Sequence, residues 1–357
     1  MFTIKAKAIL YGKELQVKNA NIIIENSKIS KITNSKETKG RVIEADLCMP
    51  GLINAHTHIA DFFLFGKIQE RDVEALFGIN GIKQRMLAKA KDEEIISGMK
   101  KALCLMQKTG TTTFCDFREG GLDGIRLLKY ALSDFKINPI ILGRPKEMKF
   151  DKNEILNLLT ESDGLGLRSP NDWSDIELNK FRKITKNKLL ATHVSETKEM
   201  VAESIQKYGQ EDTERCEKSR FDFCVHSIYS KKSTNLPIVV CPRSNFKTKI
   251  GMPKIREYIQ KKVVCLGTDN FMLNEPNLFL DMQFVLENYP ISAKEVVKMC
   301  TSNAIDLFKI KRGAILEGNY ADFVLFNDID LDNLYEYIIY NENNICDVII
   351  NGESIYE

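Results

Sequence analysis

Between residues 50 and 313 the chain alternates short apolar runs with longer amphipathic stretches. Each run begins apolar and ends polar, and there are eight of them: GLINAHTH, TTTFCDF, NPIILGRP, GLGLRSP, LLATHVSE, FDFCVHS, PIVVCPRS and VVCLGTDN. Stretches such as DEEIISGMKKALCLMQKTG place apolar residues three and four apart, which indicates helix. Eight strands separated by helices predict an α/β fold, the (β/α)8 TIM barrel, whose reactive side chains gather at the C-terminal strand ends. An open doubly wound sheet is the alternative. It normally carries a Gly-rich turn after its first strand, and HTHIADF is not such a turn.

The two ends of the chain follow a different pattern. FTIKAKAILYG and NANIIIENSKISKIT near the N-terminus, and GNYADFVLFN and NICDVIINGESIYE near the C-terminus, read as short strands broken by turn residues. Two half-sheets at opposite ends of a chain often pair. We therefore expect residues 1–49 and 314–357 to form a small composite β-sandwich domain beside a barrel of residues 50–313.

Composition changes this picture little. The chain has 357 residues, and its 51 basic and 49 acidic side chains leave a net charge of +2. That balance gives no electrostatic footprint for a nucleic acid polymer or an anionic membrane. No signal-peptide core opens the sequence, and no apolar run approaches the roughly 18 residues of a membrane helix. The nine cysteines are scattered without a CxxC pair. This usage predicts reduced thiols and a cytoplasmic location.

The candidate chemistry lies in the four histidines of the chain. His56 and His58 close the first apolar run, and residues two apart on a strand face the same side. His193 and His226 end the fifth and sixth runs, and Asp269 ends the eighth. A single histidine at a strand end is more often structural, but two adjacent buried imidazoles require partners or a cation. Three histidines and one carboxylate suit one divalent metal ion, most readily Zn²⁺, with Fe²⁺ or Mn²⁺ as alternatives.

Glu196 lies three residues after His193, where the strand should bend into a loop. This position brings a carboxyl group near the metal without making it an obvious ligand, and it suits proton transfer. A surface acid or a helix N-cap is the alternative for Glu196 taken alone.

These residues carry a family resemblance. MPGLINAHTH, ATHVSE, CVHS, CPRSN and LGTDN, in that order, resemble the amidohydrolase superfamily. They are most similar to its cytosine deaminase-like and S-adenosylhomocysteine or methylthioadenosine deaminase-like branch, which includes chlorohydrolase-type enzymes. The tail TSNAIDLF…GAILEGNYADFVLF is similar to that family's return from the barrel to the β-sandwich. The resemblance covers residues 3–352, nearly the whole chain.

The resemblance implies a mononuclear site and a set of roles. His56, His58, His193 and Asp269 match the metal ligands, with Asp269 also relaying a proton. Glu196 matches the proton-shuttling glutamate, and His226 matches a histidine that orients the hydroxide or the substrate. The run GLGLRSPNDW lacks the lysine that bridges two ions in binuclear members. By analogy with the family, a homo-oligomer is expected.

The sequence departs from the family where the substrate would be held. RSPNDWS replaces the "HxPY"-like stretch of adenosine-type deaminases, and the segment after the first strand lacks their Trp-containing stretch. A nucleoside substrate is therefore in doubt. Arg144 and Arg168 would face the barrel mouth and could hold an anionic group, with salt bridges to loop acids as the equal alternative. Trp173 could stack on a ring, although core packing is more common. Arg243 and Asn245, which follow the seventh strand, are further pocket candidates.

Together these observations predict an aminohydrolase, a hydrolase acting on carbon–nitrogen bonds other than peptide bonds. Metal-activated hydroxide would attack a small aminated purine- or pyrimidine-type heterocycle and release ammonia. Hydrolysis of a cyclic amide, or displacement of a ring substituent such as chloride, is the first alternative. A catalytically silent scaffold is a further one, but such relatives tend to lose ligands, and all the expected ligands are present here.

Overall fold

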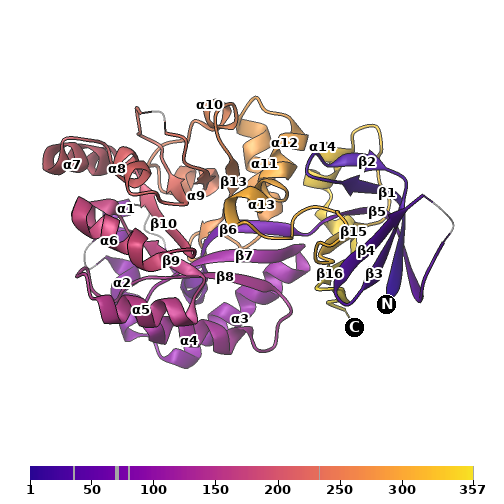
Figure 1. Ribbon diagram of the computed structural model, residues 1–357, viewed down its shortest axis with the longest axis horizontal. Coiled ribbons are helices and arrows are strands. Elements are labelled where there is room, and N and C mark those ends of the chain that lie inside the picture. The colour runs from indigo at the N-terminus through magenta and orange to yellow at the C-terminus, as the bar shows by residue number, and fades with distance from the viewer. Residues whose placement is uncertain (35–36, 69–71, 79–80, 233, 357) are drawn as a thin grey trace.

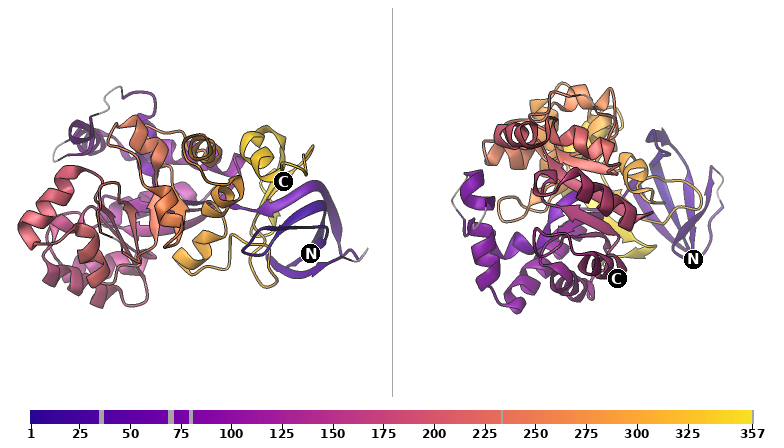
Figure 2. Two further views of the ribbon diagram at one scale, coloured as in Figure 1. Left: turned by 90° about the horizontal axis from the view of Figure 1, so that it is seen from above. Right: turned by 60° about the vertical axis from the view of Figure 1, so that its left-hand side comes forward.

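The computed structural model describes residues 1–34, 37–68, 72–78, 81–232 and 234–356. Two β-sheets organise these residues, and they lie side by side along the long axis of the molecule (Figure 1). The terminal sheet lies at one end together with both chain termini. The larger sheet lies at the other end and carries most of the helices (Figures 1 and 2).

The terminal sheet has eight strands drawn from both ends of the chain. Its strands are β1 (Phe2–Tyr11), β2 (Gln16–Lys18), β3 (Asn21–Glu25), β4 (Lys28–Thr33), β5 (Arg41–Pro50), β15 (Phe323–Phe326), β16 (Ile345–Ile350) and β17 (Glu353–Ser354). The order is β17-β16-β15-β5-β1-β3-β4, and β2 pairs with β1. The two ends meet where β15 runs antiparallel to β5, with Phe323 opposite Pro50. The predicted pairing of N- and C-terminal strands is therefore present, as one hydrogen-bonded sheet.

The second sheet has nine strands, and every pairing in it is parallel. Its strands are β6 (Leu52–His58), β7 (Thr111–Arg118), β8 (Asn138–Gly143), β9 (Gly164–Leu167), β10 (Leu189–Val194), β11 (Phe223–His226), β12 (Ile238–Val240), β13 (Val264–Leu266) and β14 (Asp269–Asn270). Each of the eight predicted runs contains a strand, and the last run contains two.

The order of this sheet runs from β13 through β12, β11, β10, β9, β8, β7 and β6 to β14. The first and last strands of the path are two pieces of one segment, separated only by Gly267 and Thr268. The sheet therefore curls round until its two edges come together. A Cβ on Gly267 would lie 2.8 Å from the backbone nitrogen of His56, so only glycine allows this close approach. Asn54 then joins the edges, because its side chain donates to Oγ1 of Thr268 at 2.7 Å and accepts from the Thr268 amide at 3.1 Å.

Helices and short 3-10 turns connect the strands, and most of them lie around the curled sheet (Figures 1 and 2). They are η1 (Ile59–Leu64), α1 (Val73–Phe77), α2 (Ile82–Lys89), α3 (Asp92–Lys108), α4 (Gly121–Leu132), α5 (Lys152–Glu161), η2 (Pro170–Asp172), α6 (Asp175–Thr185), α7 (Lys198–Tyr208), α8 (Asp212–Lys218), α9 (Pro242–Lys247), α10 (Ile255–Ile259), α11 (Leu278–Asn288), α12 (Ala293–Met299), α13 (Asn303–Phe308), α14 (Leu334–Tyr340) and η3 (Glu342–Asn344). None of the helices in the described ranges is long and apolar enough to cross a bilayer.

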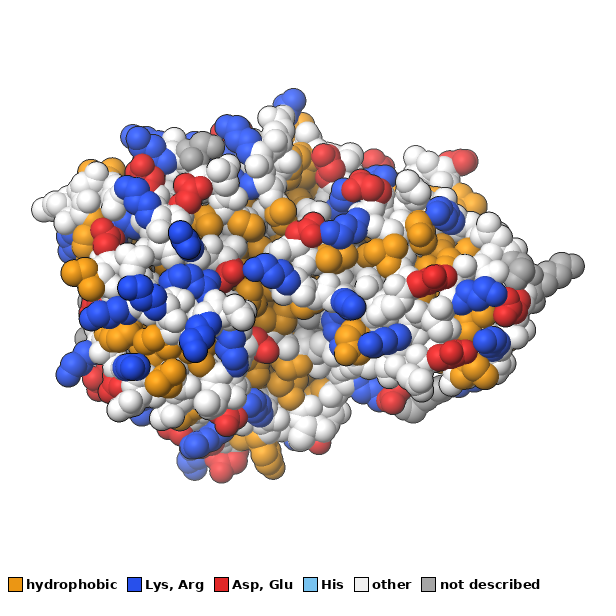
Figure 3. Space-filling model, viewed as in Figure 1, with side chains coloured by type: hydrophobic (Ala, Val, Ile, Leu, Met, Phe, Trp, Pro, Cys, Tyr) orange, Lys and Arg blue, Asp and Glu red, His pale blue; other side chains and the backbone are white. Residues whose placement is uncertain are grey.

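The core positions the site. A cluster of buried side chains comes from successive parallel strands and includes Ala55, Phe117, Ala191 and Val225. The ring of Phe117 packs edge-on against His56, with centroids 4.5 Å apart, and lies 5.0 Å from His193. The apolar core inside the curled sheet therefore packs directly against the histidines. On the face shown in Figure 3, basic and acidic side chains are interspersed over the surface.

Candidate metal centre

The four histidines and Asp269 converge at the C-terminal ends of the parallel strands. His56 and His58 end β6, His193 lies in β10, His226 ends β11, and Asp269 begins β14. One ligand atom from each of His56, His58 and His193 lies within 4.8 Å of the other two, and the same holds for His56, His226 and Asp269. Oδ1 of Asp269 lies 3.3 Å from Nε2 of His56 and 3.7 Å from Nε2 of His58. The predicted ligands therefore do come together in space.

The backbone turns sharply at two of these positions. His226 has a φ of +72° and Asp269 a φ of +61°, values in the left-handed region that non-glycine residues seldom adopt. Such strain persists where surrounding contacts over-determine it, and it clusters at functional sites. At the end of β10, Thr197 caps α7 by accepting from the Met200 amide at 3.2 Å. The cap fixes Glu196 between the strand and the helix.

Hydrogen-bonding partners orient the rings of His193 and His226 and the carboxylate of Asp269. Nδ1 of His193 lies 3.0 Å from the carbonyl oxygen of Arg168, so it carries the proton and leaves Nε2 free to bind a metal. The amide nitrogen of Asn245 lies 3.2 Å from Nδ1 of His226. Ser244 donates to Oδ2 of Asp269 at 2.6 Å, which leaves Oδ1 facing His56. These contacts hold the rings and the carboxylate in position before any ligand arrives.

Burial sets the protonation of the cluster. It lowers the pKa of His56, His58 and His193, because a charged imidazole loses its hydration there. Burial opposes ionisation of Asp269 as well. The close contact with Nε2 of His56 and the proximity of His226 outweigh it, however, so the pKa of Asp269 is lowered. Neutral imidazoles beside an ionised carboxylate are the protonation states that a divalent metal requires.

The residues present fit such an ion. Both ring nitrogens of His56 and Nδ1 of His58 are buried without a hydrogen-bond partner among the described residues. Buried polar atoms without partners are costly, and a cation shared by the rings would satisfy them. The donors are imidazole nitrogens and one carboxylate, a set typical of zinc and other borderline divalent ions. The cluster therefore has the composition and the spacing of a divalent metal site.

Glu196 lies at the edge of this cluster. Its Oε1 is 3.7 Å from Nε2 of His226, and its side chain is 20% exposed. Burial raises the pKa of Glu196, while the nearby His226 opposes the shift. A carboxyl group that has a raised pKa and lies beside a histidine at the C-terminal ends of the strands is suited to donate a proton.

The candidate substrate residues are placed less uniformly. The indole of Trp173 is 2% exposed and packs edge-on against Phe181 with centroids 4.8 Å apart, so its faces are covered by core side chains. Trp173 therefore packs in the core, which was the alternative expected for this side chain. Arg168 forms a two-point ion pair with Asp172. This is the salt bridge to a nearby acid that was the alternative to binding an anionic group of the substrate.

The other two arginines are also paired. Arg144 contacts Glu119 through Nη1 at 2.9 Å, but its buried Nη2 has no hydrogen-bond partner among the described residues. Nη2 of Arg243 pairs with Asp281 at 2.6 Å and donates to the carbonyl of Glu275 at 2.7 Å. Arg243 thus anchors α9, from which Ser244 and Asn245 reach the centre.

Sequence reasoning missed a charged network beside His58. Lys83 on α2 lies 2.9 Å from both Asp61 and Glu119, and its side chain is 7% exposed. Burial raises the pKa of Asp61 to about 7 against the opposing charge of Lys83. These residues lie in the segment after the first strand and at the end of the second. The sequence signal that could have identified these residues was their position as charged side chains close to the C-terminal ends of two predicted strands.

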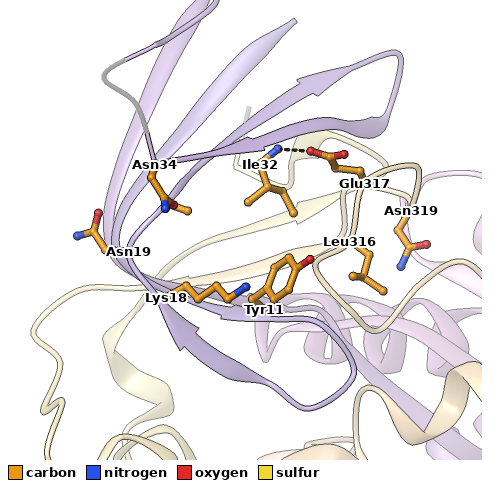
Figure 4. Close-up of a pocket in the computed structure, with 9 residues that line it drawn as sticks. Tyr11, Lys18, Asn19, Ile32, Asn34, Leu316, Glu317 and Asn319 are labelled. Carbon is orange, nitrogen blue, oxygen red and sulfur yellow. Dashed lines mark hydrogen bonds between the residues drawn. The ribbon is translucent and has the colours of Figure 1, made fainter.

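The structure also has a surface cavity of about 790 Å³ in the terminal sheet. It is lined by Tyr11, Lys18, Asn19, Ala20, Ile32, Asn34, Leu316, Glu317 and Asn319 (Figure 4). The ammonium of Lys18 lies 3.5 Å from the centre of the Tyr11 ring, and Glu317 accepts from the Ile32 amide at 2.9 Å. None of the lining residues belongs to the histidine cluster.

The chain belongs to the amidohydrolase family, whose model matches residues 47–355. It is 35% identical to an uncharacterized protein of Methanocaldococcus jannaschii, over 99% of this chain and 96% of that protein. It is 29% identical to a 5-methylthioadenosine/S-adenosylhomocysteine deaminase of Thermococcus sibiricus, over 99% and 93% of the two chains.

Solved structures share the fold. An adenosine deaminase from Xanthomonas campestris with bound zinc matches with a TM-score of 0.85 and 18% identity, over 99% of this chain and 92% of that one. The zinc complex of atrazine chlorohydrolase TrzN from Arthrobacter aurescens matches with a TM-score of 0.84 and 18% identity, over 99% and 95%. At this identity the likeness extends to the fold alone.

Proposed function

We propose that this protein is a metal-dependent aminohydrolase that removes the amine from a small aminated purine- or pyrimidine-type heterocycle and releases ammonia. The observation that carries the proposal is the position of Glu196, a largely buried carboxyl group with a raised pKa beside His226 and the ligand cluster. A relative named as a deaminase, similar over 99% of this chain, supports the same reaction.

His56, His58, His193 and Asp269 would hold one divalent ion. Zn²⁺ is the proposed metal, because three imidazole nitrogens and one carboxylate oxygen complete a site of the catalytic type with room for water. A bound Zn²⁺ supplies hydroxide near neutral pH. Metal analysis of purified protein, with Fe²⁺ and Mn²⁺ measured alongside, tests this assignment.

The side chains divide the proton transfers between them. Glu196, whose protonated form is favoured by burial, donates a proton to the ring nitrogen beside the carbon that bears the amine. Asp269 accepts one proton of the water that adds to this carbon and passes it to the departing amine. As ammonia leaves, the added hydroxyl becomes the product carbonyl and returns its remaining proton to Glu196. His226, held by Asn245 at 3.2 Å, orients the added oxygen or the substrate. Buried Nη2 of Arg144 is a candidate contact for a polar group on the substrate.

The fold assignment is completed in the same way. We propose that residues 50–313 form a closed (β/α)8 barrel in which β13 and β14 are two halves of the eighth strand. Residues 1–49 and 314–357 would form the composite β-sandwich domain. The meeting of β14 with β6 and the pairing of β15 with β5 support this division.

An ammonia-release screen of purines, pterins, pyrimidines and nucleosides, run on metal-reconstituted protein, tests the reaction. Glu196→Gln is expected to lower turnover of the best substrate by about 10²–10⁴-fold, the usual contribution of a positioned general acid. Glu199→Gln, three residues away and exposed, is the matched control and should keep full turnover. Full turnover by Glu196→Gln would show that the assigned role is wrong.

Displacement of a ring substituent such as chloride, or hydrolysis of a cyclic amide, is the second candidate function. The likeness in fold to a chlorohydrolase favours including it. Chlorinated triazines and cyclic amides in the same screen separate the two reactions, because chloride release or ring opening without ammonia would support the second.

A further inference from the structure

Glu119 lies beside one of the proposed metal ligands. It directly follows β7, and its Oε1 is 3.5 Å from Nδ1 of His58. That nitrogen is buried and has no hydrogen-bond partner among the described residues. On the other side of the ring, Nε2 lies 3.7 Å from Asp269. The two nitrogens of His58 therefore face two different carboxylates, and Glu119 is the one that lies outside the ligand cluster.

Two cations contact the oxygen of Glu119 that faces His58. Nζ of Lys83 and Nη1 of Arg144 each lie 2.9 Å from the same Oε1 that faces His58. Both cations are themselves anchored. Lys83 lies 2.9 Å from Asp61, and Nε of Arg144 donates to the carbonyl of Gly166 at 3.2 Å. The carboxylate is thus fixed from the segment after β6 and from the end of β8 at once.

We propose that Glu119 is a positioning residue of the metal centre. It accepts the Nδ1 proton of His58 and so leaves Nε2 as the ligand atom, while Lys83 and Arg144 keep the carboxylate in place. The inference rests on the proposed metal centre. Metal-binding histidines generally donate their second N–H to a carboxylate, a carbonyl or water, which fixes the ring and raises its basicity. His193 uses the Arg168 carbonyl in this way, and Glu119 gives His58 a charged acceptor.

The inference is tested by metal affinity, which requires no knowledge of the substrate. Metal-free protein is titrated with Zn²⁺ in competition with a chromophoric chelator. Glu119→Gln keeps the size of the side chain and removes its charge, and the dissociation constant for Zn²⁺ is expected to rise about 10–100-fold. Glu119→Asp keeps the charge but withdraws the carboxylate from His58, so it should also weaken binding.

A matched control separates this effect from a change in net charge. Glu161 pairs with Lys129 at 2.7 Å on the surface, and Glu161→Gln should bind Zn²⁺ like the wild type. The Co²⁺-substituted proteins provide a second measurement, because a displaced His58 changes the visible absorption of the bound ion. We expect this change in both Glu119 variants and not in Glu161→Gln.

The outcomes are distinct. Thermal melting of the metal-free proteins identifies a variant that does not fold. If Glu119→Gln does not fold, Glu119→Asp, which keeps the charge of its ion pairs, decides the question. Affinity within twofold of the wild type in each folded Glu119 variant would overturn the inference and leave the proposed metal centre standing. A wild-type protein that binds no divalent ion would overturn the metal centre itself, together with the inference.

Discussion

Glu196, Asp269 and His226 each contact a side chain from another element, and single substitutions of these contacts should therefore have separable effects. Glu196 faces His226, Ser244 holds Asp269, and Asn245 holds His226. Ser244 and Asn245 come from one short helix, α9, whose Arg243 is paired with the buried Asp281. The RSN stretch thus supports the site. Arg243 anchors the helix, and Ser244 and Asn245 hold Asp269 and His226.

The raised pKa of Glu196 gives a pH prediction. Only the protonated carboxyl group donates a proton, so kcat/KM should be highest below the pKa of Glu196 and fall as the pH rises through it. Because burial moves this pKa upward, the fall should occur above the normal range of a glutamate, about 4.3. Measuring kcat/KM against pH checks this, and the same limb should be absent from the residual activity of Glu196→Gln. An unchanged limb in that variant would assign it to another group.

Removal of the Ser244 hydroxyl should impair the reaction more than the fold. Its hydrogen bond to an ionised carboxylate is worth about 1.5–3 kcal/mol, so Ser244→Ala is expected to lower kcat/KM by about 10–100-fold. Ser133→Ala serves as the control, since its hydroxyl bonds only to exposed groups on the surface. Equal kcat/KM values for both variants would contradict the role given to Ser244.

At the scale of elements, the hydrophobic pattern predicted the strands well, because short apolar runs bounded by polar residues and separated by amphipathic stretches are typical of buried parallel strands. All eight runs contain strands. The ends of the first, fifth and eighth bring the predicted ligands together, and the end of the sixth places His226 beside them. The break in the eighth strand was not predictable. It depends on a positive φ at Asp269 and on the absence of a side chain at Gly267, and neither changes the apolar pattern.

The charged network was missed for a related reason. Lys83 lies on a short helix in which half of the residues are polar, and a lysine in such a sequence is usually solvated. Its burial arises from Asp61 and Glu119, which are distant along the chain. Trp173 was a candidate because an indole can stack on a flat ring, but its side chain packs edge-on against Phe181 in the core.

Gly267 tests the closure of the curled sheet. In Gly267→Ala the new Cβ would lie 2.8 Å from both the backbone nitrogen and Cβ of His56. Overpacking of this kind usually costs about 1–3 kcal/mol. We expect a lower melting temperature and weaker Zn²⁺ binding, because the shift falls on a proposed ligand. Gly143→Ala is the matched strand control, since its Cβ would meet the side-chain ends of Ile125 and Leu158, at 3.1 and 3.3 Å. It should lose less stability and keep its metal affinity.

At the scale of the whole molecule, Asp322 ties the terminal sheet to the rest of the chain. Its side chain is paired with Arg312 and accepts from the Asn351 amide at 2.7 Å, while its carbonyl accepts from the Gly51 amide at 2.9 Å. Three segments that are distant in sequence therefore meet at one buried residue. Pattern analysis predicted that the terminal strands would pair, but it gave no indication of this junction.

Loss of the Asp322 side chain should lower the stability of the fold without changing the affinity for Zn²⁺. Asp322→Ala leaves the largely buried Arg312 without its acidic partner, and breaking a buried ion pair typically costs about 3–5 kcal/mol. The melting temperature should fall clearly while the Zn²⁺ affinity of the folded protein stays at the wild-type value. Asp306→Ala, which removes an exposed pair with Lys13, should cost no more than about 1 kcal/mol. Comparable melting temperatures for the two variants would contradict the role of Asp322.

The direct passage from β5 into β6 has a consequence for the order of assembly. Only Gly51 separates the two strands, and β5 is paired on one side by β15. During synthesis, the strand that bears His56 and His58 therefore extends from a sheet whose neighbouring strand has yet to be made. Residues 323–326 must emerge before that edge is covered, and Asp269 has emerged by then. Loading of the ion by all four residues should accordingly be a late event, which cannot precede the synthesis of Asp269.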